Sequence, residues 1–178
     1  IEEHYWPLGS DGQLPKGLAG LTVGMADRLD SLIGLFAVGL APTGTADPFG
    51  QRRAALGVVQ PLLGRELDFD LRVGLQAAAA LQPVAADTAL DQAVEFVARR
   101  LRGVLREEGY RPDVVEAALA VQGCNPWRVQ QAAEQLSAWM VRSDWQLTLD
   151  AFARCVRIIP NDETTAVPDS NLFIDDAE

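Results

Sequence analysis

The sequence has few of the residues that metal and nucleophilic chemistry require. Among its 178 residues are one histidine, His4, and two cysteines, Cys124 and Cys155. A hydrolytic metal centre needs about three protein ligands, and a reactive cysteine needs a base or a site that stabilises its thiolate. His4 with scattered aspartates such as Asp27 and Asp30 does not supply such a set of ligands, so we predict no metal site. Neither cysteine has a histidine near it in the sequence that could act as its base. We expect both cysteines to be small buried side chains in a reduced, cytoplasmic protein.

Long apolar runs are also absent. The longest, Leu32 to Pro42, has about 11 residues, whereas a helix needs about 20 apolar residues to span a membrane. We therefore expect no membrane contact. The first residue is Ile1 rather than Met and no signal peptide is evident, so we expect a segment of a longer protein.

Lysine is nearly absent, and the charge is unevenly distributed. The 25 acidic and 15 basic residues give a net charge of −10, and Lys16 is the one lysine. Residues 1–50 carry −4, residues 51–91 carry −1, residues 92–160 carry +1 and residues 161–178 carry −6. A strongly acidic chain argues against uniform binding to nucleic acid. The central, arginine-rich segment is nevertheless compatible with an RNA contact.

Apolar residues recur with the helical period of 3.6 residues, and no segment alternates with the period of a strand. The spacing, together with capping residues and prolines, predicts an all-α bundle of about seven helices followed by an extended acidic tail. Asp47-Pro48 is expected to cap and open the second helix, and Pro61 to kink or end it. Tryptophans in helical patterns are expected in the core, namely Trp127, Trp139 and Trp145.

Arginines cluster in one helical segment, residues 99–106, and Arg111 follows closely. Arginine pairs with phosphates and stacks on unpaired bases, as RNA recognition requires. The alternative is a solvated helix face that pairs with Glu95, Glu107 and Glu108. For Arg52 and Arg53 we expect a role in helix packing, against acids such as Asp27 or Asp30.

Several motifs together resemble the β subunit of bacterial heterotetrameric glycyl-tRNA synthetase. The most specific reads PTGTADPF at 42–49 and RRAALG at 52–57, where the family reads PTGSKDPFALRRAALG. Similar runs are EEHYWP at 2–7, ADRLDSLIGLF at 26–36, EEGY at 107–110, DVV at 113–115 and ARCVRII at 153–159. Ala46 stands where the family has lysine.

The resemblance implies where the chain lies within that subunit. Residues 1–46 correspond to the C-terminal end of an HD-like domain and residues 47–91 to a helical linker. Residues 92–160 correspond to a helical region leading into a DALR-type anticodon-binding domain, and residues 161–178 to an acidic connector.

The resemblance also implies a function. In the family, glycine activation with ATP and Mg²⁺ belongs to the α subunit, whereas the β subunit binds tRNA(Gly) and is needed for aminoacylation. The chain would be a non-catalytic part of this ligase, without a cofactor of its own, and its partners would be tRNA(Gly) and the α subunit. The expected tRNA-binding side chains, acting on phosphates rather than base edges, are Arg99, Arg102, Arg106, Arg111, Arg154 and Arg157. The alternative is a helical scaffold or subunit-interaction module without direct RNA contact, with exposed apolar patches.

Overall fold

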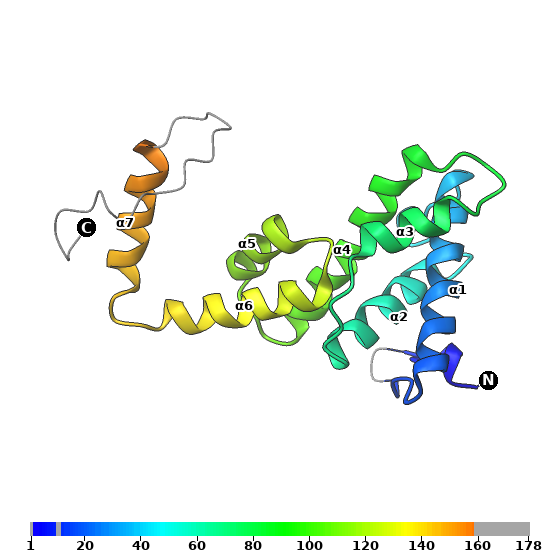
Figure 1. Ribbon diagram of the computed structural model, residues 1–178, viewed down its shortest axis with the longest axis horizontal. Coiled ribbons are helices and arrows are strands. Elements are labelled where there is room, and N and C mark those ends of the chain that lie inside the picture. The colour runs from blue at the N-terminus through cyan, green and yellow to red at the C-terminus, as the bar shows by residue number, and fades with distance from the viewer. Residues whose placement is uncertain (1, 10–11, 159–178) are drawn as a thin grey trace, which may run out of the picture. The chain divides into compact units, whose positions relative to one another are not determined.

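A computed structural model describes residues 2–9 and 12–158, without the side chain of residue 87. Its elements are the 3₁₀ helix η1 (Glu2–Tyr5) and the helices α1 (Leu18–Ala37), α2 (Gln51–Gly64), α3 (Leu71–Ala79), α4 (Asp87–Glu107), α5 (Pro112–Gln122), α6 (Pro126–Met140) and α7 (Trp145–Ile158) (Figure 1). Within these residues the only β pairing is an isolated bridge between Thr43 and Ala46. The predicted all-α fold of about seven helices is confirmed. The acidic tail expected at 161–178 lies outside the described residues.

The chain divides into two compact units, Ile1–Trp139 and Met140–Glu178, and each is described by itself. In the described part of the chain, no helix is both long and apolar enough to cross a membrane.

Capping side chains fix where two of the helices begin. Asp70 precedes α3, and its carboxylate accepts hydrogen bonds from the N–H groups of Arg72 and Val73 at 2.8 and 3.2 Å. Asn125 precedes α6, and its side-chain oxygen accepts from the N–H of Arg128 at 3.2 Å. These contacts satisfy backbone donors that have no partner within the helix.

Pro61 was expected to kink or end α2, but the helix continues through it to Gly64. A proline this close to the C-terminus removes one backbone hydrogen bond of a helix that is about to end. The last turn is held by burial, since Leu62 and Leu63 are 1 % and 7 % exposed. Packing therefore outweighs the local cost of the proline.

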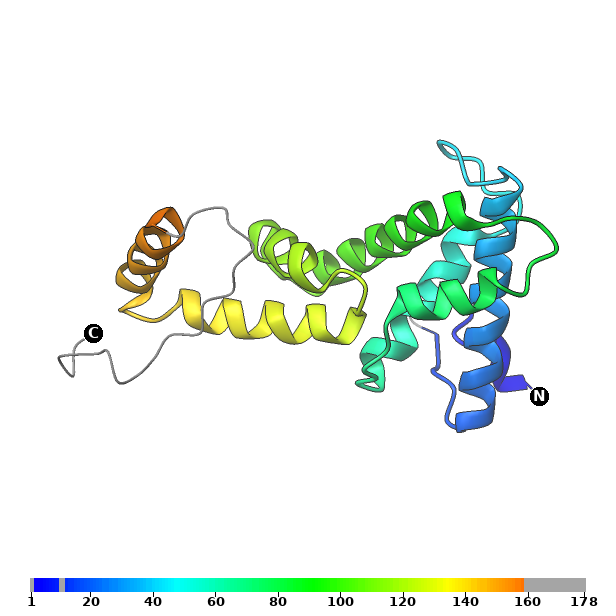
Figure 2. The same ribbon diagram turned by 45° about the horizontal axis from the view of Figure 1, so that its top comes forward.

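Four helices, α1 to α4, pack around the core of the first unit (Figures 1 and 2). Each contributes large aliphatic side chains that are almost fully buried, among them Leu32, Ile33, Val58, Leu62, Leu71, Leu75, Leu101 and Leu105. Burying one such side chain stabilises a fold by about 1.5–3 kcal/mol. The apolar stripes read from the sequence thus form one continuous core.

Helix α4 has one apolar and one charged face. Val97, Leu101 and Leu105 are completely buried, and the ring of Phe96 packs on that of Phe36 with centroids 5.3 Å apart. The helix ends before Gly109, whose φ of 96° lies in the left-handed region that favours glycine. Since these contacts fix the rotation of the helix, its arginines lie on the remaining surface.

The N-terminal segment is held to this core by Arg28 of α1. Its guanidinium donates to the backbone carbonyl oxygens of His4, Tyr5 and Trp6 at 3.0, 2.9 and 3.0 Å. The side chain lies against Gly57 of α2, where any Cβ would collide with its Nε. One half-buried arginine therefore joins η1, α1 and α2.

The expectation that the tryptophans and cysteines lie in the core is wrong. Trp127 and Trp145 are half-buried and Trp139 is 54 % exposed. Cys124 is half-buried and Cys155 is exposed. For the tryptophans and Cys155 the reason is that α7 buries none of its described side chains and α6 buries only a narrow face, whereas Cys124 lies in the turn between α5 and α6.

We predict that Arg28→Ala lowers the free energy of unfolding by about 2 kcal/mol, because it removes charge-assisted hydrogen bonds to three carbonyl groups. Urea unfolding followed by circular dichroism measures this. The matched control is Arg53→Ala, an exposed arginine of α2, which should change stability by less than about 0.5 kcal/mol. Equal effects of the two substitutions would contradict the role assigned to Arg28.

Candidate functional site

Two of the arginines expected to bind RNA share one carboxylate. Arg102 Nε and Arg106 Nη2, both on α4, lie 2.9 and 2.8 Å from the same Oε1 atom of Glu116 on α5. These hydrogen bonds and the two positive charges hold the pKa of Glu116 below its ordinary value. The cluster keeps a net charge of +1. The alternative interpretation expected these two arginines to pair with carboxylates of their own segment, such as Glu107 and Glu108. The carboxylate comes instead from the next helix, α5.

Arg111 and Arg99 have carboxylate neighbours close in the sequence. Arg111 donates to both oxygens of Asp113, at 3.1 and 2.7 Å, and the arginine lowers the pKa of that carboxyl. Arg99 lies 3.8 Å from Glu95 one turn earlier and stays half exposed. Exposed ion pairs of this kind contribute about 0–1 kcal/mol. They leave both guanidinium groups accessible from solvent.

Arg154 and Arg157 belong to the second unit and are three residues apart on α7, a spacing that places side chains on one side of a helix. Both are exposed. Within the described part of the chain, neither forms an ion pair or hydrogen bond. Among the described residues they are therefore two cations of the second unit that no carboxylate neutralises.

Arg100 is an arginine that sequence reasoning left out. It lines a groove of about 700 Å³ between α2 and α4, together with Arg99. Its Nε is buried and, among the described residues, has no hydrogen-bond partner. In the sequence, Arg100 lies one position along α4 from Arg99 and therefore beside the face that carries Arg99, Arg102 and Arg106. The helix period alone could not show that this position faces a groove.

The far end of that groove is acidic and joined to α6. Glu107 and Glu108 line it, and Glu108 accepts a hydrogen bond from Gln130 at 3.4 Å. The hydroxyl of Tyr110 donates to Glu134 at 3.2 Å. Burial, followed by the charge of Glu134, raises the pKa of Tyr110 to about 12. The phenol is therefore a fixed hydrogen-bond donor at neutral pH rather than a proton-transfer group.

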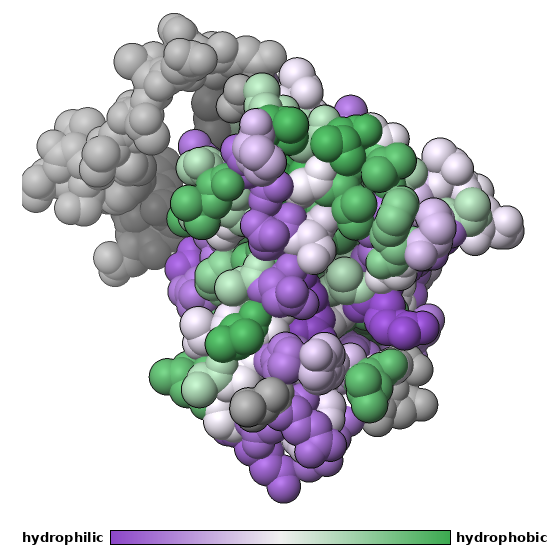
Figure 3. Space-filling view, turned by 90° about the vertical axis from the view of Figure 1, so that its right-hand side faces the viewer, coloured by the Kyte–Doolittle hydropathy of each residue, from purple (hydrophilic) through white to green (hydrophobic). Residues whose placement is uncertain are grey.

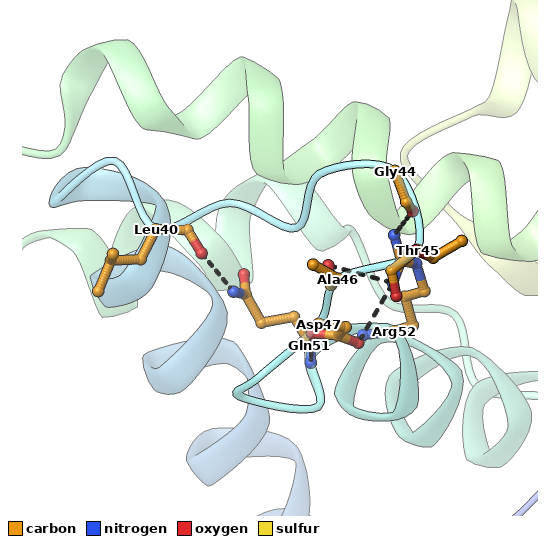
Figure 4. A network of polar contacts seen from close by, with 7 residues as sticks. All are labelled: Leu40, Gly44, Thr45, Ala46, Asp47, Gln51 and Arg52. Atoms are coloured by element: carbon orange, nitrogen blue, oxygen red, sulfur yellow. Dashed lines mark hydrogen bonds and ion pairs between the residues drawn. The ribbon is translucent and has the colours of Figure 1, made fainter.

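The motif at 42–49 forms an exposed loop whose shape is set by α2 (Figure 4). The guanidinium of Arg52 donates to the carbonyl oxygens of Gly44 and Ala46 at 2.5 and 3.4 Å. It also lies 4.0 Å from Asp47. Arg52 therefore supports this loop instead of pairing with Asp27 or Asp30, so the expectation is wrong for Arg52.

Asp47 caps α2 from a distance. The sequence predicted Asp47 as N-cap with Pro48 as first helical residue, but α2 begins at Gln51 after Gly50 in the left-handed region, with φ 65°. The carboxylate still accepts from the N–H groups of Gln51 and Arg52 at 2.8 and 2.9 Å. The prediction was thus right about the capping group and wrong about the first residue of the helix.

A buried amide completes the loop. Gln51 is 1 % exposed, and its Nε2 donates to the carbonyl oxygen of Leu40 at 2.6 Å. Figure 4 shows this bond joining the loop's two ends. Gln51 lies outside the motif at 42–49 and holds the backbone on either side of it together. Phe49, at 53 % exposed, remains on the outside.

The described residues contain no group of three or more His, Cys, Asp or Glu side chains placed to hold a metal ion. Accessible guanidinium groups on α4 and α7 are the main chemical feature. Such groups bind anions, and phosphate matches their planar donor geometry. The arrangement favours binding over proton transfer or nucleophilic attack.

Comparison with known proteins gives a consistent result. The sequence profile of a family described as "Glycyl-tRNA synthetase beta subunit" matches residues 1–120. The chain is 36 % identical to the "Glycine--tRNA ligase beta subunit" of Moorella thermoacetica over 167 residues, which cover 89 % of the chain and 24 % of that protein. It is 33 % identical to that of Pseudomonas aeruginosa (strain LESB58) over 182 residues, which cover 100 % of the chain and 27 % of that protein.

A third relative of the same name, from Myxococcus xanthus, is 38 % identical over 168 residues, covering 89 % of the chain and 24 % of that protein. The chain thus spans about a quarter of the length of the curated relatives it matches.

We predict that Asp47→Ala lowers the free energy of unfolding by about 1 kcal/mol, because two N–H groups at the start of α2 lose their acceptor. Thermal and urea unfolding measure the loss. Asp27→Ala, which removes an exposed carboxylate in the middle of α1, is the control and should change stability by less than about 0.5 kcal/mol. A loss no greater for Asp47→Ala than for this control would contradict the capping role.

Proposed function

The chain belongs to the glycyl-tRNA synthetase β-subunit family, and from this membership we propose that it supports tRNA(Gly) binding within a glycine–tRNA ligase. The observation that carries the proposal is the family match over residues 1–120. Activation of glycine with ATP and Mg²⁺ would belong to a separate α subunit, which would be the protein partner. The segment itself would use no cofactor and supply no catalytic residue.

The proposed contacts are electrostatic. We assign phosphate binding to the six arginines predicted from the sequence, namely Arg99, Arg102, Arg106, Arg111, Arg154 and Arg157. Arg154 and Arg157 have no carboxylate partner in the described residues and are the most open. For Arg102 and Arg106, a phosphate would compete with one exposed carboxylate, and such ion pairs are worth only about 0–1 kcal/mol. Binding should therefore depend strongly on salt.

We further propose that the chain joins two domains of the β subunit. Residues 1–46 would end an HD-like domain, residues 47–91 would form a helical linker, and residues 92–160 would lead through α4–α7 toward an anticodon-binding domain. Residues 161–178 would be an acidic connector.

A helical scaffold without direct RNA contact is the second candidate function, and specific observations favour it. Arg102, Arg106 and Arg111 have carboxylate partners. Apolar side chains also remain on the surface. Leu149, Phe152 and Val156 follow one face of α7 and are 41 %, 66 % and 52 % exposed.

The first unit has exposed apolar side chains as well. On the side of the molecule where α1 lies, apolar patches alternate with polar side chains (Figure 3). Leu18 at the start of α1 and Leu81 after α3 are 72 % and 83 % exposed. Surfaces of this kind suit contacts with other parts of an assembly.

We predict that the double substitution Arg102→Ala and Arg106→Ala in the whole β subunit weakens tRNA(Gly) binding about 10-fold at low salt. The slope of log affinity against log salt should fall by roughly 1–2, as expected for two lost phosphate contacts. Filter binding or fluorescence anisotropy at several KCl concentrations measures both. Glu116→Gln, which releases both arginines from their carboxylate, should bind at least as tightly as wild type. An unchanged affinity and slope in the double variant would reject these contacts.

The scaffold candidate makes a different prediction. Leu149→Ser with Phe152→Ser should weaken association with the α subunit, measured by analytical ultracentrifugation, because it removes apolar area that an interface would bury. Arg142→Ala, an arginine of the same unit paired with Asp144 at 2.6 Å, is the control. The scaffold candidate is rejected if the Leu149→Ser and Phe152→Ser variant associates with the α subunit as wild type does while the Arg102→Ala and Arg106→Ala variant binds tRNA more weakly. RNA binding would then remain as the function.

A further inference from the structure

We propose that the groove between α2 and α4 binds a phosphodiester group of the tRNA backbone through Arg100, assisted by Arg99. This inference rests on the proposed tRNA-binding function and adds a residue and a location to it. Arg100 lies in the arginine cluster at residues 99–106, but the six arginines assigned above do not include it.

Arg100 is a half-buried cation whose Nε has no hydrogen-bond partner among the described residues. That Nε is inaccessible to solvent, and within the described part of the chain the guanidinium forms no ion pair. The guanidinium carbon of Arg100 lies 5.9 Å from the centroid of the Phe96 ring. Removing a charged group from water is unfavourable unless an opposite charge or hydrogen bonds compensate it. An anionic ligand in the groove would supply the opposite charge.

The groove provides space for that ligand. Its volume is about 700 Å³, and its apolar walls include Leu56, Leu63 and Val104. Gly103 also lines it, and a Cβ at this position would meet no atom within 4 Å. The side chain of Arg99 at the rim is 53 % exposed. One arginine thus lies within the groove and a second at its edge, where a backbone phosphate could reach both.

Charge along the groove selects which end an anion occupies. Arg99 and Arg100 line one end, whereas Glu107 and Glu108 line the other. Seven residues of α-helix separate Arg100 from Glu107, a rise of about 10 Å. An anion is therefore attracted to the arginine end and repelled from the other. The planar guanidinium fork favours a phosphate with two accessible oxygens, which a phosphodiester has.

The neighbouring arginines of α4 differ in this respect. Arg102 and Arg106 already share Glu116, so a phosphate there has to displace a carboxylate. At Arg100 no carboxylate of the described residues forms an ion pair that a phosphate would have to displace. We therefore expect Arg100 to contribute more to tRNA affinity than either of these two residues.

The test uses the whole β subunit with tRNA(Gly) at several KCl concentrations. Arg100→Met keeps an apolar stem in the groove and removes the charge, so that the fold is retained. It should weaken binding about 5- to 10-fold and reduce the salt slope by roughly 0.7–0.9. Arg100→Lys keeps the charge without the fork, and should preserve the slope while losing part of the affinity. The matched control is Arg72→Ala, an exposed arginine paired with Asp91 at 2.7 Å, which should bind within about twofold of wild type.

The remaining outcomes separate this inference from the proposed function. If wild type binds tRNA(Gly) and Arg100→Met binds with the same affinity and slope, the groove assignment is overturned and the proposed function stands. If wild type does not bind tRNA(Gly), both are overturned. Stabilisation of wild type but not Arg100→Met by inorganic phosphate, with tRNA binding unchanged, would overturn RNA in favour of a free anion. If Arg100→Met weakens association with the α subunit but leaves tRNA binding unchanged, the inference is overturned, and the ligand of Arg100 is a carboxylate of that subunit.

Discussion

Burial of one face of α4 is the constraint on which the rest of the structure depends. Val97, Leu101 and Leu105 have no exposed surface, and α1, α2 and α3 all pack on this helix. A helix whose apolar face is buried against its neighbours cannot rotate about its axis without exposing that face to water. The positions of its arginines are therefore a consequence of its leucines and valine. Arg102 and Arg106 reach α5, while Arg100 is directed to the groove beside α2.

Much of the fold could be predicted from the sequence because it is encoded locally. The 3.6-residue spacing predicted about seven helices, which is the number found in the described residues, and short-range capping by Asp70 and Asn125 fixes where two of them begin. The polar contacts were less accessible, since they join residues far apart in the sequence. The bonds from Arg28 to His4 and from Arg128 to Asp68 span 24 and 60 residues. The tryptophans show the limit of patterning, because periodicity identifies a face but not what covers it.

The candidate site divides in the same way. The arginine cluster was visible in the sequence, whereas the carboxylate shared by Arg102 and Arg106 was not, because Glu116 lies on the next helix. The family motif at 42–49 was also visible, but its physical role was not. Arg52 donates to a carbonyl oxygen of the loop, and Asp47 accepts from the first N–H groups of α2. A specific sequence motif can therefore preserve a backbone shape rather than a set of chemical groups.

The contact between Gly57 and Arg28 has a consequence for how this segment can evolve. The side chain of Arg28 occupies the volume that a side chain at position 57 would fill, so Gly57 cannot be enlarged while Arg28 keeps this conformation. A larger residue at 57 becomes acceptable only if position 28 is shortened in the same lineage, and the N-terminal segment then loses its anchor. We therefore expect the two positions to covary across related proteins, although they are 29 positions apart and lie on different helices.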